Sequence, residues 1–154
     1  MVAEKGKTGV VVDTYALLSM AYGEVGSKAK EILEGIKRRE VIGVLPVTVI
    51  YEYAVHWYRG RIPALKSMEE VITFLSTYFK VENLTLSDWI KASEAKCYGD
   101  KLLREAEDQS LRARSLSIVD STIIAVALRL KMPIISGDRD LTYVAKNMGV
   151  EVIW

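Results

Sequence analysis

The chain has 154 residues, of which 50% are hydrophobic and 27% are charged, as is usual for one globular domain. Its 21 basic and 20 acidic residues give a net charge of +1, which argues against a general polycation but leaves room for a local basic patch. A chain of this size buries roughly 70% of its unfolded surface, so its core needs no covalent staples.

Cysteine content and hydropathy favour a cytoplasmic protein. The single cysteine, Cys97, cannot form an intramolecular disulfide, which fits a reducing compartment. Because no base lies near it in the sequence, we expect Cys97 to be a buried structural thiol. Residues 1–9 lack the apolar segment of a signal peptide, and no run of about 18 apolar residues occurs, so we expect no membrane span.

Short β-branched runs alternate with longer segments of helical periodicity. Strands are expected at residues 10–12, 41–45, 81–84, 133–136 and 150–153. Helices are expected at residues 27–39, 47–59, 62–79, 85–107, 118–130 and 141–148, with a polar loop at 108–115. This alternation predicts parallel βαβ units and therefore one three-layer α/β/α domain.

The periodicity also predicts which helix faces are buried. In the helix over 47–59, the expected core stripe is Val47, Ile50, Tyr51, Ala54, Val55 and Tyr58. In the helix over 62–79, it is Leu65, Met68, Ile72, Leu75 and Phe79. The helix over 85–107 opens with a capping box, Thr85 to Asp88, and packs through the small residues Ala92, Ala95 and Gly99.

Three aspartates occupy positions at which a cleft in a parallel α/β fold would be found. Asp13 ends the valine run 10–12, Asp120 opens the apolar helix over 118–130, and Asp138 follows the strand over 133–136. Parallel sheets place ligands at the carboxyl ends of their strands. Carboxylates gathered there repel one another, which favours a divalent cation and chemistry on a phosphodiester.

Each aspartate also has a purely structural explanation. Asp13 can cap a helix that starts at Thr14, and Asp120 fits position N3 of a capping box that begins at Ser117. Asp138 and Asp140 suit a turn, and we expect Asp140 to cap the last helix, which leaves Asp138 for the cleft. The prediction of a metal site therefore depends on the joint placement of these residues.

Glu52 lies beside the predicted core stripe of its helix, where it could be solvated or could rim a cleft. His56 is four residues further on and shares a face with Glu52. A zinc site is disfavoured because the chain has only one histidine. We expect a hydrogen-bonded or exposed histidine.

The ordered set of these motifs resembles the PIN domain family over residues 8–153, and within it the VapC-type toxins of toxin–antitoxin pairs. The resemblance is carried by the segments Val11-Val12-Asp13-Thr14, Pro46 through Tyr51-Glu52, Ile118 to Ala125 around Asp120, and Ile134 to Asp140 around Asp138. It implies a Mg²⁺- or Mn²⁺-dependent endoribonuclease, and leaves open whether one or two ions bind.

The resemblance assigns roles to individual residues. Asp13, Glu52, Asp120 and Asp138 align with the catalytic acids of the family. Asp13, Asp120 and Asp138 are the expected metal ligands, with Glu52 and Asp140 as further candidates, directly or through water. Thr14 and Ser136 match polar positions expected to contact substrate.

The resemblance also implies a fold and partners. It implies a parallel, five-stranded sheet in a domain over residues 8–154, preceded by a short tail over 1–7. It further implies an RNA substrate, a homodimer and inhibition by a cognate antitoxin. The aromatic residues Tyr51, Tyr53, Trp57 and Tyr58 surround more than one face of their helix, which favours a protein interface there.

Two arginines are the expected phosphate contacts. Arg112 and Arg114 precede the helix of Asp120 in a predicted loop, and the guanidinium fork suits phosphate oxygens. Two alternatives to the toxin remain: a PIN scaffold that binds RNA or protein without cutting it, and an RNA-processing nuclease. A haloacid-dehalogenase-like phosphatase is disfavoured, because that family needs an acid two residues after the first and Tyr15 stands there.

Overall fold

A computed structural model describes residues 7–154 and contains one five-stranded sheet. The strands are β1 (Thr8–Val12), β2 (Val41–Pro46), β3 (Phe79–Glu82), β4 (Ile134–Ile135) and β5 (Val152–Ile153). All neighbouring strands are parallel, in the order β3-β2-β1-β4-β5. The predicted parallel five-stranded sheet is confirmed. The predicted tail over 1–7 lies outside the described residues except for Lys7.

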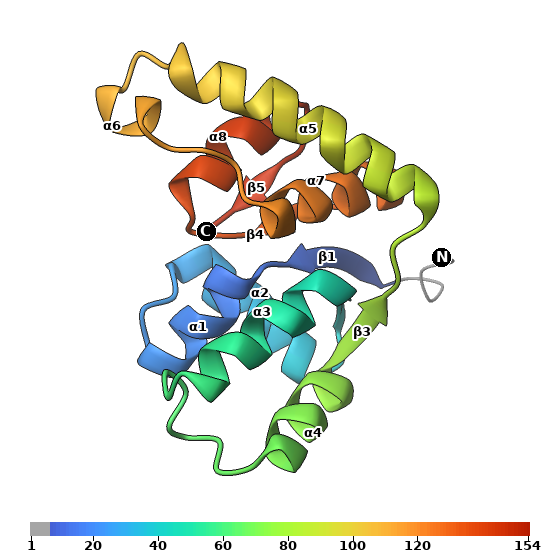
Figure 1. Cartoon of the computed structure of the whole chain (residues 1–154). Coiled ribbons are helices and arrows are strands. Elements are labelled where there is room, and N and C mark those ends of the chain that lie inside the picture. The colour runs from blue at the N-terminus through green and yellow to red at the C-terminus, as the bar shows by residue number, and fades with distance from the viewer. Residues whose placement is uncertain (1–6) are drawn as a thin grey trace.

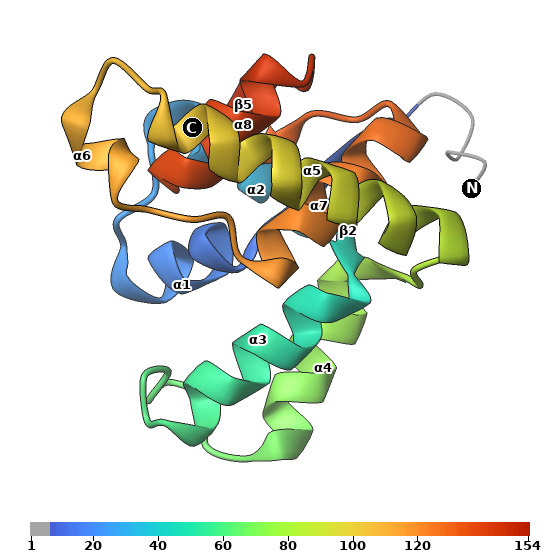
Figure 2. The same ribbon diagram turned by 45° about the horizontal axis from the view of Figure 1, so that its top comes forward.

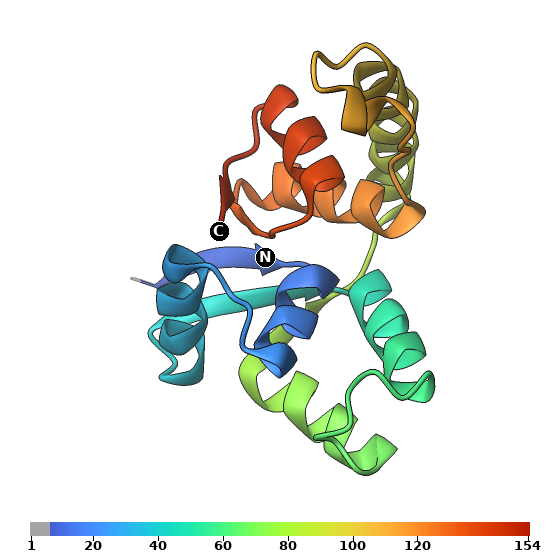
Figure 3. The ribbon, with the colours of Figure 1, turned by 90° about the vertical axis from the view of Figure 1, so that its left-hand side faces the viewer.

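Helices cover both faces of the sheet, as Figures 1 and 3 show. On one side lie α1 (Thr14–Tyr22), α2 (Ser27–Lys37), α3 (Val47–Tyr58) and α4 (Met68–Tyr78). On the other lie α5 (Leu86–Arg104), α6 (Gln109–Arg112), α7 (Ile118–Leu130) and α8 (Arg139–Asn147). In Figure 2, α5 crosses over α7, and α7 lies between α5 and the sheet. The predicted α/β/α architecture is thereby confirmed.

The strand order creates a crevice beside β1. The chain passes from β1 outward to β2 and β3, then returns to the other side of β1 to form β4 and β5. In doubly wound sheets, ligands bind where the strand order reverses, outside the carboxyl ends of the strands. Asp13 follows β1 and Ser136 follows β4, so both residues lie at this point.

Local capping signals set several helix boundaries. The Thr85 hydroxyl accepts from Asp88 N at 3.0 Å, and Asp88 Oδ2 accepts from Thr85 N at 2.9 Å, so the predicted capping box opens α5. Ser117 caps α7 by accepting from Asp120 N at 3.0 Å. The helix predicted over 118–130 therefore has the bounds that the sequence indicated.

Several predicted boundaries were wrong. The strand predicted over 81–84, for example, lies at Phe79–Glu82. The helix predicted over 62–79 begins only at Met68, where the Ser67 side chain caps it, and it ends at Tyr78 because Phe79 enters β3. The predicted loop over 108–115 contains the short helix α6, which Asp108 caps by accepting from Ser110 N. For both helices, a polar side chain fixed a start that hydrophobic periodicity did not reveal.

The predicted inner face of α3 was also wrong. Its buried side chains are Val49 and Tyr53, whereas Tyr51 is 72% exposed and Tyr58 is 73% exposed. Helix α3 contacts α1, α7 and β2 at the rim of the sheet, so no single stripe faces one core. On α4, Leu75 is buried as predicted, whereas Ile72 is exposed and Val71 is buried, against the predicted stripe.

Packing of α5 follows the prediction for its small residues but not for its thiol. Ala92, Ala95 and Gly99 are buried, and Gly99 lies against Val144 of α8. Cys97, expected to be buried, is exposed because it lies on the outward face of α5. No helix within residues 7–154 is both long and apolar enough to cross a membrane.

Candidate active site

Asp13 is the most deeply buried acid of the site. It follows β1 and caps α1, with Oδ1 accepting from Ala16 N at 2.8 Å, so the predicted cap is confirmed. The other oxygen, Oδ2, accepts a hydrogen bond from the Ser136 hydroxyl at 2.5 Å. Ser136 Oγ in turn accepts from Asp138 N at 3.0 Å. These bonds join the carboxyl ends of β1 and β4 and fix the carboxylate of Asp13.

Asp120 reaches the same place from the other layer. It occupies the first turn of α7, which leads into β4, so the start of α7 lies near the carboxyl ends of the strands. The hydroxyls of Thr48 on α3 and Thr122 on α7 lie 2.7 Å apart and join these two helices. Glu52 lies one turn after Thr48 and faces the carboxylate of Asp120 closely enough to raise its pKa.

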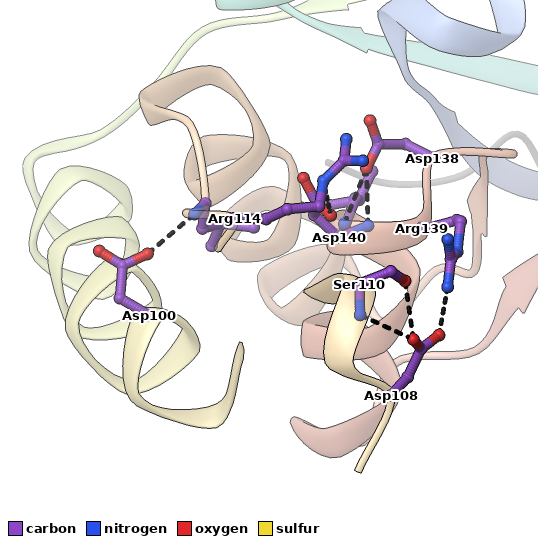
Figure 4. Close-up of polar contacts among 9 residues, drawn as sticks. Asp100, Asp108, Ser110, Arg114, Asp138, Arg139 and Asp140 are labelled. Atoms are coloured by element: carbon purple, nitrogen blue, oxygen red, sulfur yellow. Dashed lines mark hydrogen bonds and ion pairs between the residues drawn. The ribbon is translucent and has the colours of Figure 1, made fainter. Parts of the chain in front are cut away.

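The roles predicted for Asp138 and Asp140 need correction. Asp138, not Asp140, caps α8, because its Oδ1 accepts from Asp140 N at 2.9 Å and from Leu141 N at 3.0 Å. Asp140 lies inside the first turn, where its Oδ1 is 2.6 Å from Nε of Arg114 (Figure 4). Capping does not remove Asp138 from the cleft, since its side chain also lines the cavity described next.

A cavity of about 320 Å³ brings the predicted acids together. Its walls include all four predicted catalytic acids and Asp140, together with Thr14, Tyr15, Leu18, His56, Ser115 and Ser117. Sequence reasoning did not assign His56 to the site. Its spacing of four residues from Glu52 on one helix was the signal that could have placed it there.

Burial and repulsion from neighbouring carboxylates make Asp13 and Asp120 hard to ionise. Burial raises the pKa of Asp120 to about 7, and the nearby carboxylates of Asp138 and Glu52 contribute in the same direction. Burial likewise holds the pKa of Asp13 well above its usual value, although the bonds from Ser136 and Ala16 oppose this. The cavity is therefore a place where positive charge would be strongly favoured.

The donor set fits a hard divalent cation. Carboxylate and hydroxyl oxygens are the ligands that Mg²⁺ and Mn²⁺ prefer. Thr14 lines this cavity, and its buried Oγ1 has no hydrogen-bond partner among the described residues, which leaves a polar atom for a ligand or its water to satisfy. Within residues 7–154, no three Asp, Glu, His or Cys side chains already have the arrangement of a metal site.

The two predicted phosphate contacts differ in their surroundings. Arg112 Nε donates to the carbonyl of Ala106 at 2.7 Å, a bond that closes the segment around α6. Arg114 projects from the segment before α7 to Asp140 (Figure 4). Asp140 raises the pKa of Arg114, and the negative charge of Asp138 adds to this effect. Of the two, the structure places only Arg114 beside the acids.

A second, larger cavity of about 940 Å³ lies across the segment 136–140 from the acids. Ser136 and Gly137 line it, as do Trp154 and the side chain of Arg139, which pairs with Asp108 (Figure 4). A Cβ on Gly137 would lie only 2.6 Å from both Tyr15 and Trp154, so glycine is needed for this close packing. The basic and acidic residues around this cavity nearly balance, unlike those of the acidic cavity.

The parallel sheet, its crevice beside β1 and the four converging acids define an α/β domain with an acidic cavity at the carboxyl ends of its strands. The sequence matches the PIN domain family over residues 10–147, and the chain belongs to that family. Membership supports a nuclease, since domains of this family generally act as metal-dependent nucleases. No curated protein sequence matches the chain.

Solved structures share the fold at low sequence identity. The chain is similar to PAE2754 from Pyrobaculum aerophilum (TM-score 0.58, 18% identity, covering 96% of this chain and 87% of that one). It is also similar to Mycobacterium tuberculosis VapC20, a sarcin-ricin loop cleaving toxin (0.56, 20%, 86% and 92%). A domain of a functionally unknown Methanocaldococcus jannaschii protein is a third such structure (0.52, 20%, 96% and 90%).

Proposed function

We propose that this protein is a Mg²⁺- or Mn²⁺-dependent endoribonuclease whose active site is the acidic cavity. The observation that carries the proposal is the convergence of Asp13, Glu52, Asp120 and Asp138 on one cavity whose described lining contains no lysine or arginine. Membership of the PIN domain family supports the same conclusion. The ion, the RNA substrate and the site residues are parts of the proposal.

The acids divide into two groups in this proposed mechanism. Asp13, Asp120 and Asp138 would hold the cation, and Glu52 and Asp140 complete the acidic wall. A bound Mg²⁺ or Mn²⁺ would offset their repulsion, neutralise charge on a phosphodiester and activate water for attack on phosphorus. Ser136 keeps the carboxylate of Asp13 in one orientation through its short hydrogen bond.

Substrate contacts come from the rim of the site. Thr14 offers a buried hydroxyl without a hydrogen-bond partner among the described residues, and Arg114 stands beside Asp140 at the edge of the acids. We include Arg114 as the phosphate contact, because its exposed guanidinium can pair with Asp140 and with an incoming phosphate. Arg112 is a weaker candidate, since its Nε is already bonded to the backbone.

The test is cleavage of RNA by purified protein with Mg²⁺ or Mn²⁺, and again with EDTA. We expect Asp13→Asn and Asp120→Asn each to lower cleavage at least about 100-fold, because each removes a ligand charge. Glu94→Gln is the matched control: it removes one carboxylate from the exposed face of α5, where Glu94 pairs with Lys91. Equal cleavage by wild type and both Asn variants would indicate a contaminating nuclease and refute the site.

A biological role as the toxin of a toxin–antitoxin pair is the second level of the proposal. The fold shared with the toxin VapC20 supports it. We expect expression of the wild-type protein to arrest growth and expression of Asp120→Asn to leave growth unchanged. Cleavage in vitro without growth arrest would instead favour an RNA-processing nuclease. RNA binding without any metal-dependent cleavage would favour a binding module.

The exposed aromatic residues of α3 support a protein interface on this helix. Tyr51 and Tyr58 present large rings to solvent, a feature enriched at interfaces. We propose that this surface joins two copies of the chain or receives an antitoxin. Light scattering should detect a dimer in the wild type and a monomer in a Tyr51→Lys/Tyr58→Lys variant. A monomeric wild type at high concentration would refute the dimer.

A further inference from the structure

His56 is the one side chain of the acidic cavity that carries nitrogen, among the residues that the structure describes around it. The other polar walls are carboxylates and hydroxyls. An RNA backbone offers mainly oxygen acceptors, and an ionised carboxylate can only accept, so the two repel each other. A neutral donor in this wall therefore has a task that the acids cannot perform.

The hydrogen bond between Arg61 and His56 fixes which ring nitrogen carries the proton. Arg61 Nη1 and His56 Nδ1 are 2.8 Å apart. A guanidinium has five donors and no acceptor, so Nδ1 must accept, and the proton of the imidazole is on Nε2. Arg61 covers the Nδ1 edge and does not line the cavity, so Nε2–H is the ring donor of His56 that is still available to a ligand there.

Arg61 is itself held in place by the turn that ends α3. Gly60 has a φ of 74°, a conformation that favours glycine, and Arg61 N donates to the carbonyl of His56 at 3.1 Å. The hydroxyl of Tyr22 on α1 donates to the Arg61 carbonyl. This turn directs the guanidinium back onto the helix that carries His56.

We propose that His56 is a substrate-positioning residue, whose Nε2–H donates a hydrogen bond to an oxygen of the RNA backbone beside the acidic cluster, and that Arg61 acts through it by fixing the tautomer. This rests on the proposed ribonuclease function. Zinc binding, considered for the Glu52–His56 pair from sequence, has no part in this role, because Nδ1 is engaged and Nε2 carries hydrogen.

The tautomer can be tested without any activity. The chain contains a single histidine, so ¹⁵N NMR of tag-free protein gives one pair of ring signals to assign. At mildly alkaline pH we expect the Nε2–H form in the wild type and a mixture of tautomers in Arg61→Ala. Arg59→Ala removes a neighbouring arginine and should keep the wild-type tautomer. An Nδ1–H form in the wild type would overturn the inference, whatever the protein cleaves.

Kinetics test the role in substrate positioning. The probe is a fluorescent RNA oligonucleotide that contains a cleavage site mapped with the wild-type protein. We expect His56→Ala to lower kcat/KM about 10- to 100-fold, the usual effect of losing a hydrogen bond to a charged group. His56→Gln keeps an N–H donor and should recover most of this loss. Wild-type kinetics in His56→Ala, with Asp120→Asn inactive, would refute the inference while leaving the proposed nuclease intact.

A double-mutant cycle separates Arg61 from a direct phosphate contact. If Arg61 acts only through His56, then Arg61→Ala should lower kcat/KM in the wild type, by roughly 3-fold, and have no further effect in His56→Ala. The slope of affinity against salt should also stay unchanged in Arg61→Ala, because no phosphate charge is lost. Additive losses and a shallower salt slope would show that Arg61 itself binds phosphate, which overturns its assigned role.

Discussion

Two groups of acidic side chains at opposite ends of α7 differ in how their charge is balanced. At the start of α7, Asp120 faces Asp138 and Glu52, and burial with their repulsion raises its pKa to about 7. At the end of α7, Arg129 binds Asp88 at 2.9 and 3.0 Å and Glu82 at 3.1 Å. Burial alone would raise the pKa of Asp88. The hydrogen bonds that Asp88 accepts from Arg129 and from Thr85 N outweigh burial and lower this pKa.

The difference shows how the acids of the proposed active site differ from a structural acidic group. Both groups combine buried carboxylates from separate elements, so acid content alone does not separate them. The Arg129 group contains its own cation and stabilises the fold. In the cavity group Arg114 pairs with Asp140, which leaves the repulsion on Asp120 without a balancing cation. Removing a charge should therefore have opposite effects on stability in the two groups.

The largest effect is expected from breaking the structural group. Arg129→Met leaves the buried carboxylate of Asp88 without its partner, and we expect a loss of about 3 kcal/mol in the free energy of unfolding. Asp120→Asn removes a repelled charge and should leave stability unchanged or raise it. Urea denaturation of both variants in EDTA measures this contrast. A destabilised Asp120→Asn and an unaffected Arg129→Met would reverse the comparison.

Metal addition should stabilise the cavity group alone. At roughly 100 times its Kd, a cation that binds only the folded state adds about 2.7 kcal/mol, which thermal unfolding detects as a rise in Tm. We expect Mg²⁺ or Mn²⁺ to raise the Tm of the wild type and of Arg129→Met, but not that of Asp120→Asn. The same rise in all three proteins would place the cation elsewhere.

The pH dependence of stability should separate the two groups by sign. In Asp120 the folded-state pKa of about 7 exceeds the ordinary value of 3.8, so its contribution is fully present below 3.8 and is lost as pH rises through about 7. Asp88 has a lowered pKa, so its contribution is present above 3.8 and is lost as pH falls below that value. Without metal, stability should rise on mild acidification and fall on strong acidification.

Single variants should show which acid causes each change of stability with pH. Asp120→Asn should reduce the rise in stability as the pH falls from about 7 to 4. Part of that rise should remain, because burial also raises the pKa of Asp13. Asp88→Asn should reduce the fall at lower pH. Chemical denaturation across this pH range, in EDTA, provides the measurement. If Asp120→Asn keeps the full rise on mild acidification, another group causes it.

The smallest effect is expected at an exposed ion pair, which serves as a baseline. Lys91 and Glu94 on α5 are 2.8 Å apart, and their side chains are 46% and 62% exposed. Solvent and salt screen such pairs, so Glu94→Gln should change stability by less than about 1 kcal/mol. A change as large as that of Arg129→Met would mean that burial does not control the strength of these pairs.

The sequence was sufficient where a structure depends on neighbouring residues. Capping residues Thr85 and Ser117 placed the starts of α5 and α7, because these bonds form within one helical turn. The β-branched runs located the strands other than β3, which was predicted over 81–84 and lies at Phe79–Glu82. The order of the acidic motifs predicted the family and the acids that line the cavity. Capping chemistry was less informative at Asp138 and Asp140, because either residue could open the same helix.

Only the tertiary structure decided which faces are buried and how each charge is balanced. The predicted stripe of α3 failed because three separate elements contact that helix, and periodicity assumes one core face. Cys97 is exposed for a related reason, since α5 packs through its small residues on the opposite face. Arg129 meets Asp88 across 41 positions of the chain, and His56 lines the cavity of Asp13. Such contacts depend on how distant elements pack, which no local pattern of residues contains.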